Sequence, residues 1–316
     1  MVRIALAGDT MLGRGVAERL HDDPKATLVS PEVLAVAAEA DVTILNLECC
    51  ISERGERWPD PSKPFFFRAP PVAVDTLRAL GVGCVTLANN HALDYGTVAL
   101  ADTFAHLEAA GIAWVGAGPD LAAARSPALL AADGQPLSVV GFTDHPAECA
   151  AGVDRSGVAY ADLRTGVPGW LTCLVEACTP PVVVLAHWGP NMATGPAPQV
   201  RDTAAALERS GATLVVGHSA HVFHGVAGRV LFDLGDFVDD YRTDSVLRND
   251  LGLLWLVTLD ECGPRRLEAV PLTLEYCYTR LAVGDDARWV RRRLRAACSE
   301  LGTDVVDDED RLVFDW

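Results

Sequence analysis

Short apolar runs alternate with longer amphipathic segments along most of the chain. Seven apolar runs predict buried strands. They are Val2–Ala7, Val42–Leu45, Gly81–Leu87, Ala113–Val115, Leu137–Phe142, Val182–Leu185 and Thr213–Val216. Helical segments lie between many of these strands. They are predicted near Val16–Leu20 and over Pro31–Ala40, Pro70–Leu80, Asp94–Ala110, Arg164–Cys178, Ala197–Ser210 and Asp285–Leu301. The alternation predicts the α/β class.

The pattern changes towards the end of the chain. Gly225–Asp233 predicts a hairpin, and Asp233–Tyr241 a carboxylate-rich loop. Leu251–Leu259 and Leu267–Tyr276 predict antiparallel strands around the turn Cys262-Gly263-Pro264. Phe65–Arg68 reads as an edge strand. No linker of disordered composition and no repeat divides the chain, so a single domain over 1–316 is expected. Its core covers about 2–276, followed by a C-terminal helix and an acidic tail over 284–316.

Composition narrows the class of function. The 316 residues carry a formal charge of −17, which argues against a nucleic-acid surface and against anionic membranes. Part of that acidity lies in Asp304–Asp310, which we expect to be a solvated tail segment. The cysteine count of nine is odd, and no paired zinc spacing occurs, so we expect reduced thiols without a disulfide. The sequence begins directly with a strand and has no membrane-spanning apolar run, which favours a cytoplasmic location.

Polar side chains follow the predicted strands at five places. These residues are Asp9; Asn46 and Glu48; Asn90 and His91; His187; and His218 and His221. The carboxyl ends of parallel strands meet at one edge of a sheet, where sites in α/β proteins usually lie. Carboxylate, amide and imidazole groups are ligands for a hard or borderline divalent ion that activates water. Core histidines are common, so the histidine run alone is equally compatible with a structural role.

Several motifs carry a resemblance to a known family. They are Gly8–Arg14 (GDTMLGR), Asn46–Glu48 (NLE), Lys63–Pro71 (KPFFFRAPP), Asn89–Gly96 (NNHALDYG), His187–Gly189 (HWG), Gly217–His221 (GHSAH) and Leu234–Phe237 (LGDF). Their order resembles the CapA family of poly-γ-glutamate capsule synthesis proteins, in the calcineurin-like metallophosphoesterase superfamily. The resemblance covers about residues 2 to 245. It implies a four-layer αββα sandwich of the metallophosphoesterase type, with the site at the strand carboxyl ends.

The resemblance also implies a role for each matching residue. The implied metal ligands are Asp9, Glu48, Asn90, His187, His218 and His221, with Glu48 as the bridging carboxylate. One metal position would consist of Glu48, Asn90, His187 and His218, and the other of Asp9, Glu48 and His221. Met11 stands where the superfamily has a histidine, so the second position lacks a ligand. We therefore expect one tightly bound divalent ion of the Mn, Fe or Zn class and a second that is looser; a site without metal is the alternative.

Other polar groups near these motifs are candidates for catalysis and binding. His91 matches the histidine that supports a leaving group, while Asp9 and His224 are further acid–base candidates. The candidate substrate-binding residues are Arg14, Asn46, Lys63, Arg68, Trp188 and Asp236, of which the three cations suit a carboxylate or phosphate. His21, His106 and His145 are assigned to the surface or to packing.

Three functions remain open at this point. The first is a metal-dependent hydrolase that cleaves a phosphoester or a γ-glutamyl or peptide amide bond. The second is metal-independent acid–base chemistry on the same fold, such as epimerisation at a peptide Cα, with Asp9 and a clustered histidine as the pair. The third is a non-catalytic accessory protein of capsule biosynthesis. The expected partner is a small-molecule or peptide substrate, and the oligomeric state is left open.

Overall fold

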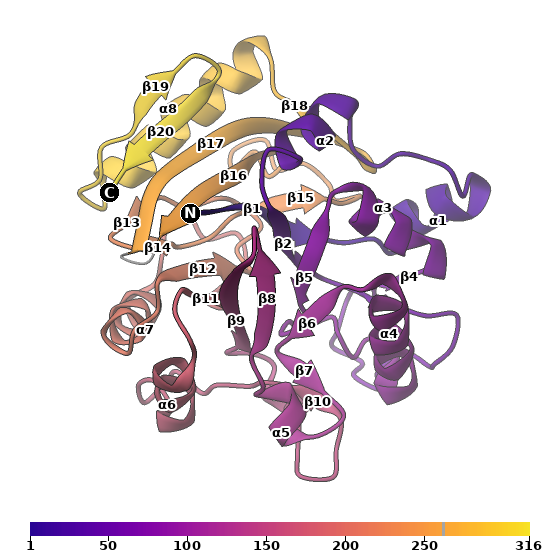
Figure 1. Cartoon of the computed structure of the whole chain (residues 1–316). Coiled ribbons are helices and arrows are strands. Elements are labelled where there is room, and N and C mark those ends of the chain that lie inside the picture. The colour runs from indigo at the N-terminus through magenta and orange to yellow at the C-terminus, as the bar shows by residue number, and fades with distance from the viewer. Residues whose placement is uncertain (261–262) are drawn as a thin grey trace.

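Two β-sheets packed against each other form the centre of the computed structural model, which describes residues 1–260 and 263–316 (Figure 1). In the described residues the larger sheet has ten strands. Its order is β19 (Val306–Asp308), β20 (Arg311–Asp315), β17 (Gly263–Glu275), β16 (Leu251–Asp260), β1 (Val2–Thr10), β2 (Val42–Leu47), β5 (Val82–Thr86) and β6 (Ala113–Val115). In addition, β15 (Asp236–Val238) pairs with β1, and β18 (Tyr278–Leu281) pairs with β17.

The second sheet has six strands within the described part of the chain. Its order is β13 (Val226–Ala227), β14 (Val230–Leu231), β12 (Leu214–His218), β11 (Val182–His187), β9 (Gln135–Thr143) and β8 (Ala128–Ala132). Two short pairs complete the strands. They are β10 (Gly157–Val158) with β7 (Ala117–Gly118), and β3 (Cys50–Ile51) with β4 (Arg68–Ala69).

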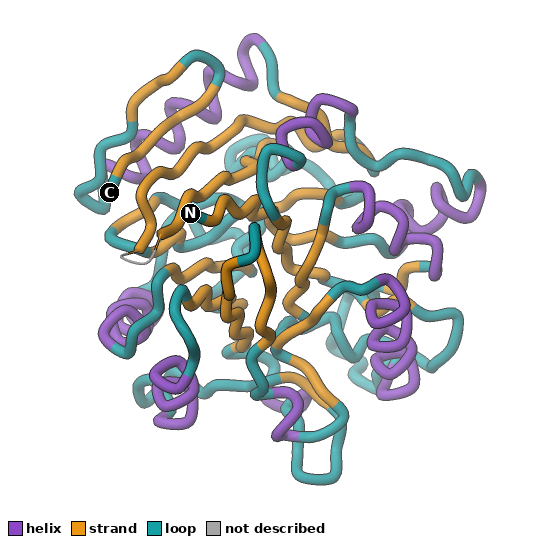
Figure 2. Tube along the Cα trace, viewed as in Figure 1, coloured by secondary structure: helices purple, strands orange, loops and turns teal. Residues whose placement is uncertain are grey.

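Helices cover the outer faces of both sheets, as Figures 1 and 2 show. On the ten-stranded side lie α1 (Arg14–Asp22), α2 (Pro31–Ala37), α3 (Val74–Ala79), preceded by the 3-10 turn Pro71–Ala73, and α4 (Gly96–Ala110). On the six-stranded side lie α6 (Gly169–Ala177) and α7 (Pro198–Arg209). The remaining helical segments are α5 (Leu121–Ala124), the 3-10 turn Ala147–Cys149 and α8 (Gly284–Ser299), which packs on β16 and β17.

Successive side chains of a strand point to opposite faces of the sheet, and the apolar side chains therefore form three separate layers. On β1, Ile4 and Leu6 face the core between the sheets, whereas Ala5 and Ala7 face the helices. The same period of two occurs on β11, where Leu185 faces the inter-sheet core and its neighbours face α6 and α7. The predicted four-layer αββα sandwich is therefore confirmed.

The structure also corrects several sequence predictions. The 304–310 segment is not a free tail, because β19 pairs with β20 at the sheet edge, although the side chains of β19 are exposed as expected. The predicted loop 233–241 contains β15, which pairs with β1. The helix predicted from Arg164 begins at Gly169, after Pro168, and α2 ends at Ala37. Of the predicted turn Cys262-Gly263-Pro264, Cys262 lies outside the described residues.

Two further observations concern the cysteines and the helices of the described residues. The eight cysteines that fall within the described residues are free thiols, six of them buried. None of the helices in residues 1–260 and 263–316 combines the length and the hydropathy that crossing a membrane requires.

Candidate metal centre

The ten-stranded sheet contributes oxygen atoms to the site. A register shift in β1 places Asp9 opposite Asn46 of β2 and Asp236 of β15. Asn46 Nδ2 donates to Asp9 Oδ1 at 2.8 Å, and Asn89 Nδ2 donates to Asn46 Oδ1 at 2.9 Å. The Asn46 side chain is fully buried and bonded at both ends of its amide. Asn46 therefore orients the Asp9 carboxylate. The sequence had predicted that Asn46 contacts the substrate.

The six-stranded sheet contributes imidazoles. His187 at the end of β11 lies in register with His218 at the end of β12, because the two strands are parallel. His218 Nδ1 lies 3.1 Å from Asp9 Oδ1, and the Ser219 backbone N–H donates to Asp9 Oδ2 at 3.2 Å. The Asp9 carboxylate thus connects the two sheets at their carboxyl-terminal edges.

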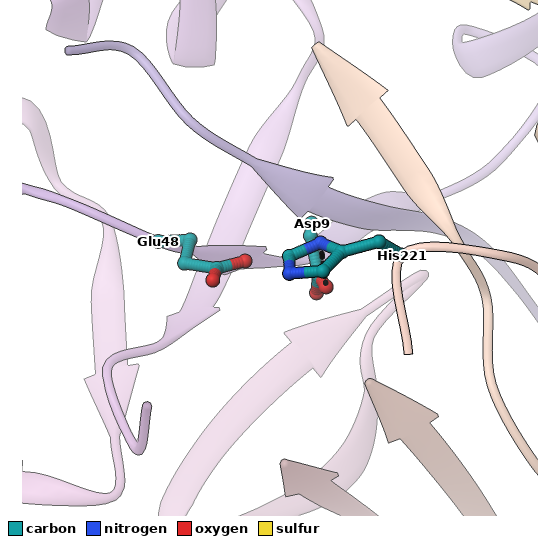
Figure 3. Close-up of side chains that lie close together, drawn as sticks. All are labelled: Asp9, Glu48 and His221. Carbon is teal, nitrogen blue, oxygen red and sulfur yellow. Dashed lines mark ion pairs between the residues drawn. The ribbon is translucent and has the colours of Figure 1, made fainter. Parts of the chain in front are cut away.

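Asp9, Glu48 and His221 come together in one group, with a ligand atom of each residue within 4.8 Å of the others (Figure 3). His221 Nδ1 is 2.8 Å from Asp236 Oδ1 and 3.5 Å from Asp9 Oδ2. A carboxylate that binds one ring nitrogen fixes the orientation of a histidine ligand. Asp236 is therefore placed to orient His221, in place of the substrate contact that the sequence suggested.

Burial and mutual charge make this group electrostatically unusual. Burial raises the pKa of Asp9, but the hydrogen bond with His218 and the neighbouring imidazoles outweigh it and hold that pKa below its usual value. Burial and the charge of Asp9 both raise the pKa of Glu48. Burial lowers the pKa of His221, and the Asp236 carboxylate outweighs it and raises that pKa above its usual value. A divalent cation would hold both carboxylates in their ionised form.

The other predicted metal position is marked by polar atoms that are buried without a hydrogen-bond partner. These atoms are Glu48 Oε1 and Oε2, Asn90 Oδ1, His187 Nε2 and His218 Nε2. Buried polar atoms normally have partners, and leaving them unpaired costs free energy. The set combines oxygen and imidazole nitrogen atoms, which suits a Zn, Mn or Fe ion. The chemistry of these donors therefore fits a divalent metal. Among the described His, Cys, Asp and Glu side chains, however, only the Asp9, Glu48 and His221 group has its ligand atoms within 4.8 Å of one another, so the structure does not gather Glu48, His187 and His218 as closely as the prediction requires.

His91 forms a pair with Asp94. His91 Nδ1 is 2.7 Å from Asp94 Oδ2, and its Nε2 is 3.8 Å from Glu48 Oε1. Its ring lies against Phe67, with centroids 4.0 Å apart. Burial lowers the pKa of His91 to about 4, although Asp94 opposes this. Sequence reasoning missed Asp94; its position three residues after His91 was the available signal.

Met11 does not reach the site as a ligand. Its side chain is fully buried in the core beneath α1, and its Sδ accepts a hydrogen bond from the Gly13 N–H at 3.0 Å. The position where the superfamily has a histidine is thus occupied by Met11, whose side chain belongs to the apolar core. The Asp9–Glu48–His221 group consequently has fewer ligands than the four that a closed tetrahedral site needs.

Two predicted residues contact other parts of the protein. His224 Nε2 bonds to the Ala193 carbonyl at 2.8 Å, and among the described residues His224 is not part of the group that Asp9, Glu48 and His221 form. Trp188 is 2% exposed and packs in the outer core, where its Nε1 donates to the Phe232 carbonyl at 3.1 Å. Neither position matches the acid–base or substrate role that we predicted.

The three cations that we predicted to bind an anion are engaged by protein groups. The Arg14 guanidinium binds Asp240 and lies over the rings of Phe65, Phe67 and Tyr241. Arg68 donates to the carbonyls of residues 54 and 55 and lies 4.2 Å from the centroid of Tyr95. Lys63 Nζ is 2.9 Å from Asp94 Oδ1 and donates to the Asn90 carbonyl at 2.6 Å.

His145, which the sequence analysis assigned to the surface or to packing, lies next to the predicted ligand His187. It follows β9, and its ring centroid is 5.0 Å from that of His187. His145 Nδ1 binds the carboxylate of Asp144, whose other oxygen accepts the Gly189 N–H at 3.1 Å. The signal was present in the sequence, because His145 follows a predicted strand in the same way as the other site histidines.

Four layers and a site at the strand ends define a metallophosphoesterase-type fold, as the resemblance implied. The family model described as "Bacterial capsule synthesis protein PGA_cap" matches residues 3–241, and the chain belongs to this family. This confirms the CapA resemblance.

Relatives of known name support the same assignment. A Mycobacterium tuberculosis protein named "Probable polyglutamine synthesis accessory protein" is 31% identical over 99% of this chain and 95% of its own length. The "PGA biosynthesis protein CapA" of Bacillus subtilis is 28% identical over 85% of this chain and 71% of its own length. Among solved structures, a hypothetical protein from Thermus thermophilus is similar in fold, with a TM-score of 0.50, 16% identity, and coverage of 85% of this chain and 98% of that one.

Proposed function

We propose that this CapA-family protein is a metal-dependent hydrolase that cleaves a phosphoester or a γ-glutamyl or peptide amide bond. The observation that carries the proposal is the set of unpartnered buried atoms on Glu48, Asn90, His187 and His218. Two sheets supply these atoms, and no hydrogen bond within the described residues satisfies them. A group of this kind is stable when a cation occupies it.

Each residue has a distinct part in this proposal. Glu48, Asn90, His187 and His218 would hold the tighter ion, and Asp9, Glu48 and His221 the looser one. When bound, the ion supplies Lewis-acid polarisation and a water of lowered pKa. His91, held by Asp94 with its Nε2 towards Glu48, is placed to handle a proton near the reacting group.

A second candidate is metal-independent acid–base chemistry, such as epimerisation at a peptide Cα. The observation that favours it is the direct contact of the Asp9 carboxylate with His218 at 3.1 Å, which is a ready acid–base pair. The core position of Met11 favours it too, because that position supplies no ligand. The names of the relatives are also compatible with a non-catalytic accessory role in biosynthesis.

Chelation of the purified protein distinguishes these candidates. Turnover of p-nitrophenyl phosphate, bis-p-nitrophenyl phosphate and γ-glutamyl-p-nitroanilide would be measured before and after chelation and after return of Mn²⁺ or Zn²⁺. We expect turnover that chelation removes and metal restores, and that His187→Ala abolishes. The control is His21→Ala, on an exposed surface of α1. Activity that survives chelation but fails in Asp9→Asn would favour the acid–base candidate, and no turnover in any form would favour the accessory role.

A further inference from the structure

A tyrosine ring lies beside the Asp9–Glu48–His221 group. The ring of Tyr241 meets the ring of His221 edge to face, with centroids 5.3 Å apart and an angle of 82° between the planes. Tyr241 belongs to the loop after β15, the strand that pairs with β1 at Asp9. It is therefore a direct neighbour of the group, although it is not one of the proposed ligands.

The Tyr241 ring is held in place by several contacts. The Arg14 guanidinium lies over it, 5.4 Å from its centroid. Asp240 binds that guanidinium and also accepts the Gly15 N–H at 2.9 Å, and the Tyr241 N–H donates to Asp239 Oδ1 at 2.7 Å. Arg14 has a φ of 46°, which is strained for a residue other than glycine and persists where the surroundings enforce it. The ring therefore has a fixed position next to the group.

The Tyr241 hydroxyl is open to a ligand. Within residues 1–260 and 263–316 it has no hydrogen-bond partner, and it is not one of the polar atoms sealed from solvent. Burial, followed by the charges of Glu48 and Asp236, raises the pKa of Tyr241, so the hydroxyl lies within the field of these carboxylates. A divalent ion bound by the group would offset part of that charge without changing where the hydroxyl lies.

The group also leaves room for a substrate atom. Met11 supplies no ligand, so Asp9, Glu48 and His221 are fewer than the four ligands of a closed tetrahedral site. Both bond classes of the proposed function present an oxygen that suits an open position, either phosphoryl or carbonyl. A hydrogen-bond donor fixed beside an oxygen that gains negative charge lowers the barrier of such reactions.

We propose that Tyr241 is a catalytic residue of this site, whose hydroxyl donates a hydrogen bond to the substrate oxygen at the open position of the Asp9–Glu48–His221 group. The proposal rests on the proposed function, because that function supplies the ion and the bond that is cleaved. The hydroxyl keeps its proton throughout. Arg14 and Asp240 act through Tyr241 as positioning residues.

The test compares Tyr241→Phe, which removes only the hydroxyl oxygen, with the wild type, both loaded with metal. Tyr278→Phe is the matched control, because it makes the same change on β18, where the ring lies 5.5 Å from the Arg19 guanidinium. Calorimetric titration measures the binding of two oxygen-donor probes, inorganic phosphate and acetohydroxamate. Tyr241→Phe should weaken whichever probe binds by about tenfold or more, as expected for the loss of one hydrogen bond to a charged group. Tyr278→Phe should leave the affinity unchanged.

Steady-state kinetics give a second measurement, with whichever of the p-nitrophenyl and p-nitroanilide substrates is turned over. Tyr241→Phe should lower kcat by about 100-fold, leave KM nearly unchanged and retain the metal content of the wild type. Probe affinity equal to that of the wild type, or no binding of either probe to wild-type protein that contains metal, would overturn the inference and leave the proposed function standing. Wild-type protein that takes up no metal would overturn the proposed function, and the inference with it.

Discussion

The two sheets contribute different chemistry to the same site. The ten-stranded sheet supplies carboxylate and amide oxygen atoms through Asp9, Glu48 and Asn90, whereas the six-stranded sheet and its following loop supply imidazoles through His187, His218 and His221. Neither set alone offers the mixed oxygen and nitrogen ligands of a borderline divalent ion. The site therefore exists only where the two sheets are packed in one alignment.

The core between the sheets fixes that alignment. It combines residues of β1, β16 and β17 from the ten-stranded sheet with residues of β9, β11 and β12 from the six-stranded sheet (Figure 1). Interiors are close-packed, so a change in this core shifts one sheet relative to the other. The predictions below separate the contribution of the core from that of each set of ligands.

The largest effect is expected from Trp255→Ala. Trp255 is fully buried on β16 between the sheets, and its Nε1 has no hydrogen-bond partner. Removal of a buried Trp side chain costs about 3–5 kcal/mol of unfolding free energy. Chemical denaturation measures this. Trp255→Phe is the matched control: it keeps most of the apolar volume and removes the unsatisfied N–H, so a loss as large as that of Trp255→Ala would contradict the account.

Glu48→Gln tests the oxygen side of the comparison. The substitution keeps the shape of a fully buried side chain and removes its charge. Since Glu48 belongs to both proposed metal positions, metal affinity should fall by about 100-fold or more, which corresponds to about 2.7 kcal/mol. Competition with a chromophoric chelator measures the affinity. Glu53→Gln, at an exposed position, should not change it, and equal affinities in all three proteins would reject Glu48 as a ligand.

Asp236→Asn tests the imidazole side. The side chain keeps its size but no longer offers a carboxylate to His221 Nδ1, 2.8 Å away. Loss of such an orienting group typically lowers metal affinity by about 10- to 100-fold. The effect should fall on the looser ion, so metal titration should lose its weaker phase and keep its tighter one. Asp75→Asn, at an exposed position of α3, is the control, and loss of the tighter phase instead would contradict this assignment.

The smallest effect is expected at Ser219. This residue has a φ of 105°, a conformation that costs about 1–3 kcal/mol for a residue other than glycine. Its side chain donates a weak hydrogen bond to the Gly189 carbonyl at 3.3 Å. Both Ser219→Gly and Ser219→Ala remove that bond, but only glycine relieves the strain. Thermal unfolding should show the glycine variant to be about 1 kcal/mol more stable than the alanine variant; the reverse order would exclude strain at this position.

The sequence predicted the fold better than it predicted the roles of individual side chains. Strand ends are visible in a sequence, because an apolar run stops at a polar residue, and parallel pairing then brings those ends together. This rule placed Asp9, His187 and His218 at strand ends and Glu48 directly after a strand, which is where the structure has them. It does not show which way a long side chain turns. Arg14 was therefore expected to bind an anion, whereas the structure pairs it with Asp240, a partner 226 residues away in the chain.

The predictions for Trp188 and His145 differ from the structure for a similar reason. Trp188 lies directly after a site histidine, yet successive strand residues point to opposite faces, so its ring enters the outer core. His145 was assigned to the surface or to packing, although it follows a predicted strand as the other histidines do. Its contact with His187 depends on the parallel register of β9 and β11, which no local pattern contains.

Elemental analysis of the protein purified without added metal tests the central claim most directly. The account predicts about one tightly bound ion of the Mn, Fe or Zn class per chain. It also predicts that Asn90→Ala, from the ten-stranded side, and His187→Ala, from the six-stranded side, each lose that ion while His21→Ala keeps it. A wild-type protein without metal that does not take up Mn²⁺ or Zn²⁺, or metal content that is the same in all four proteins, would contradict a metal centre built by both sheets.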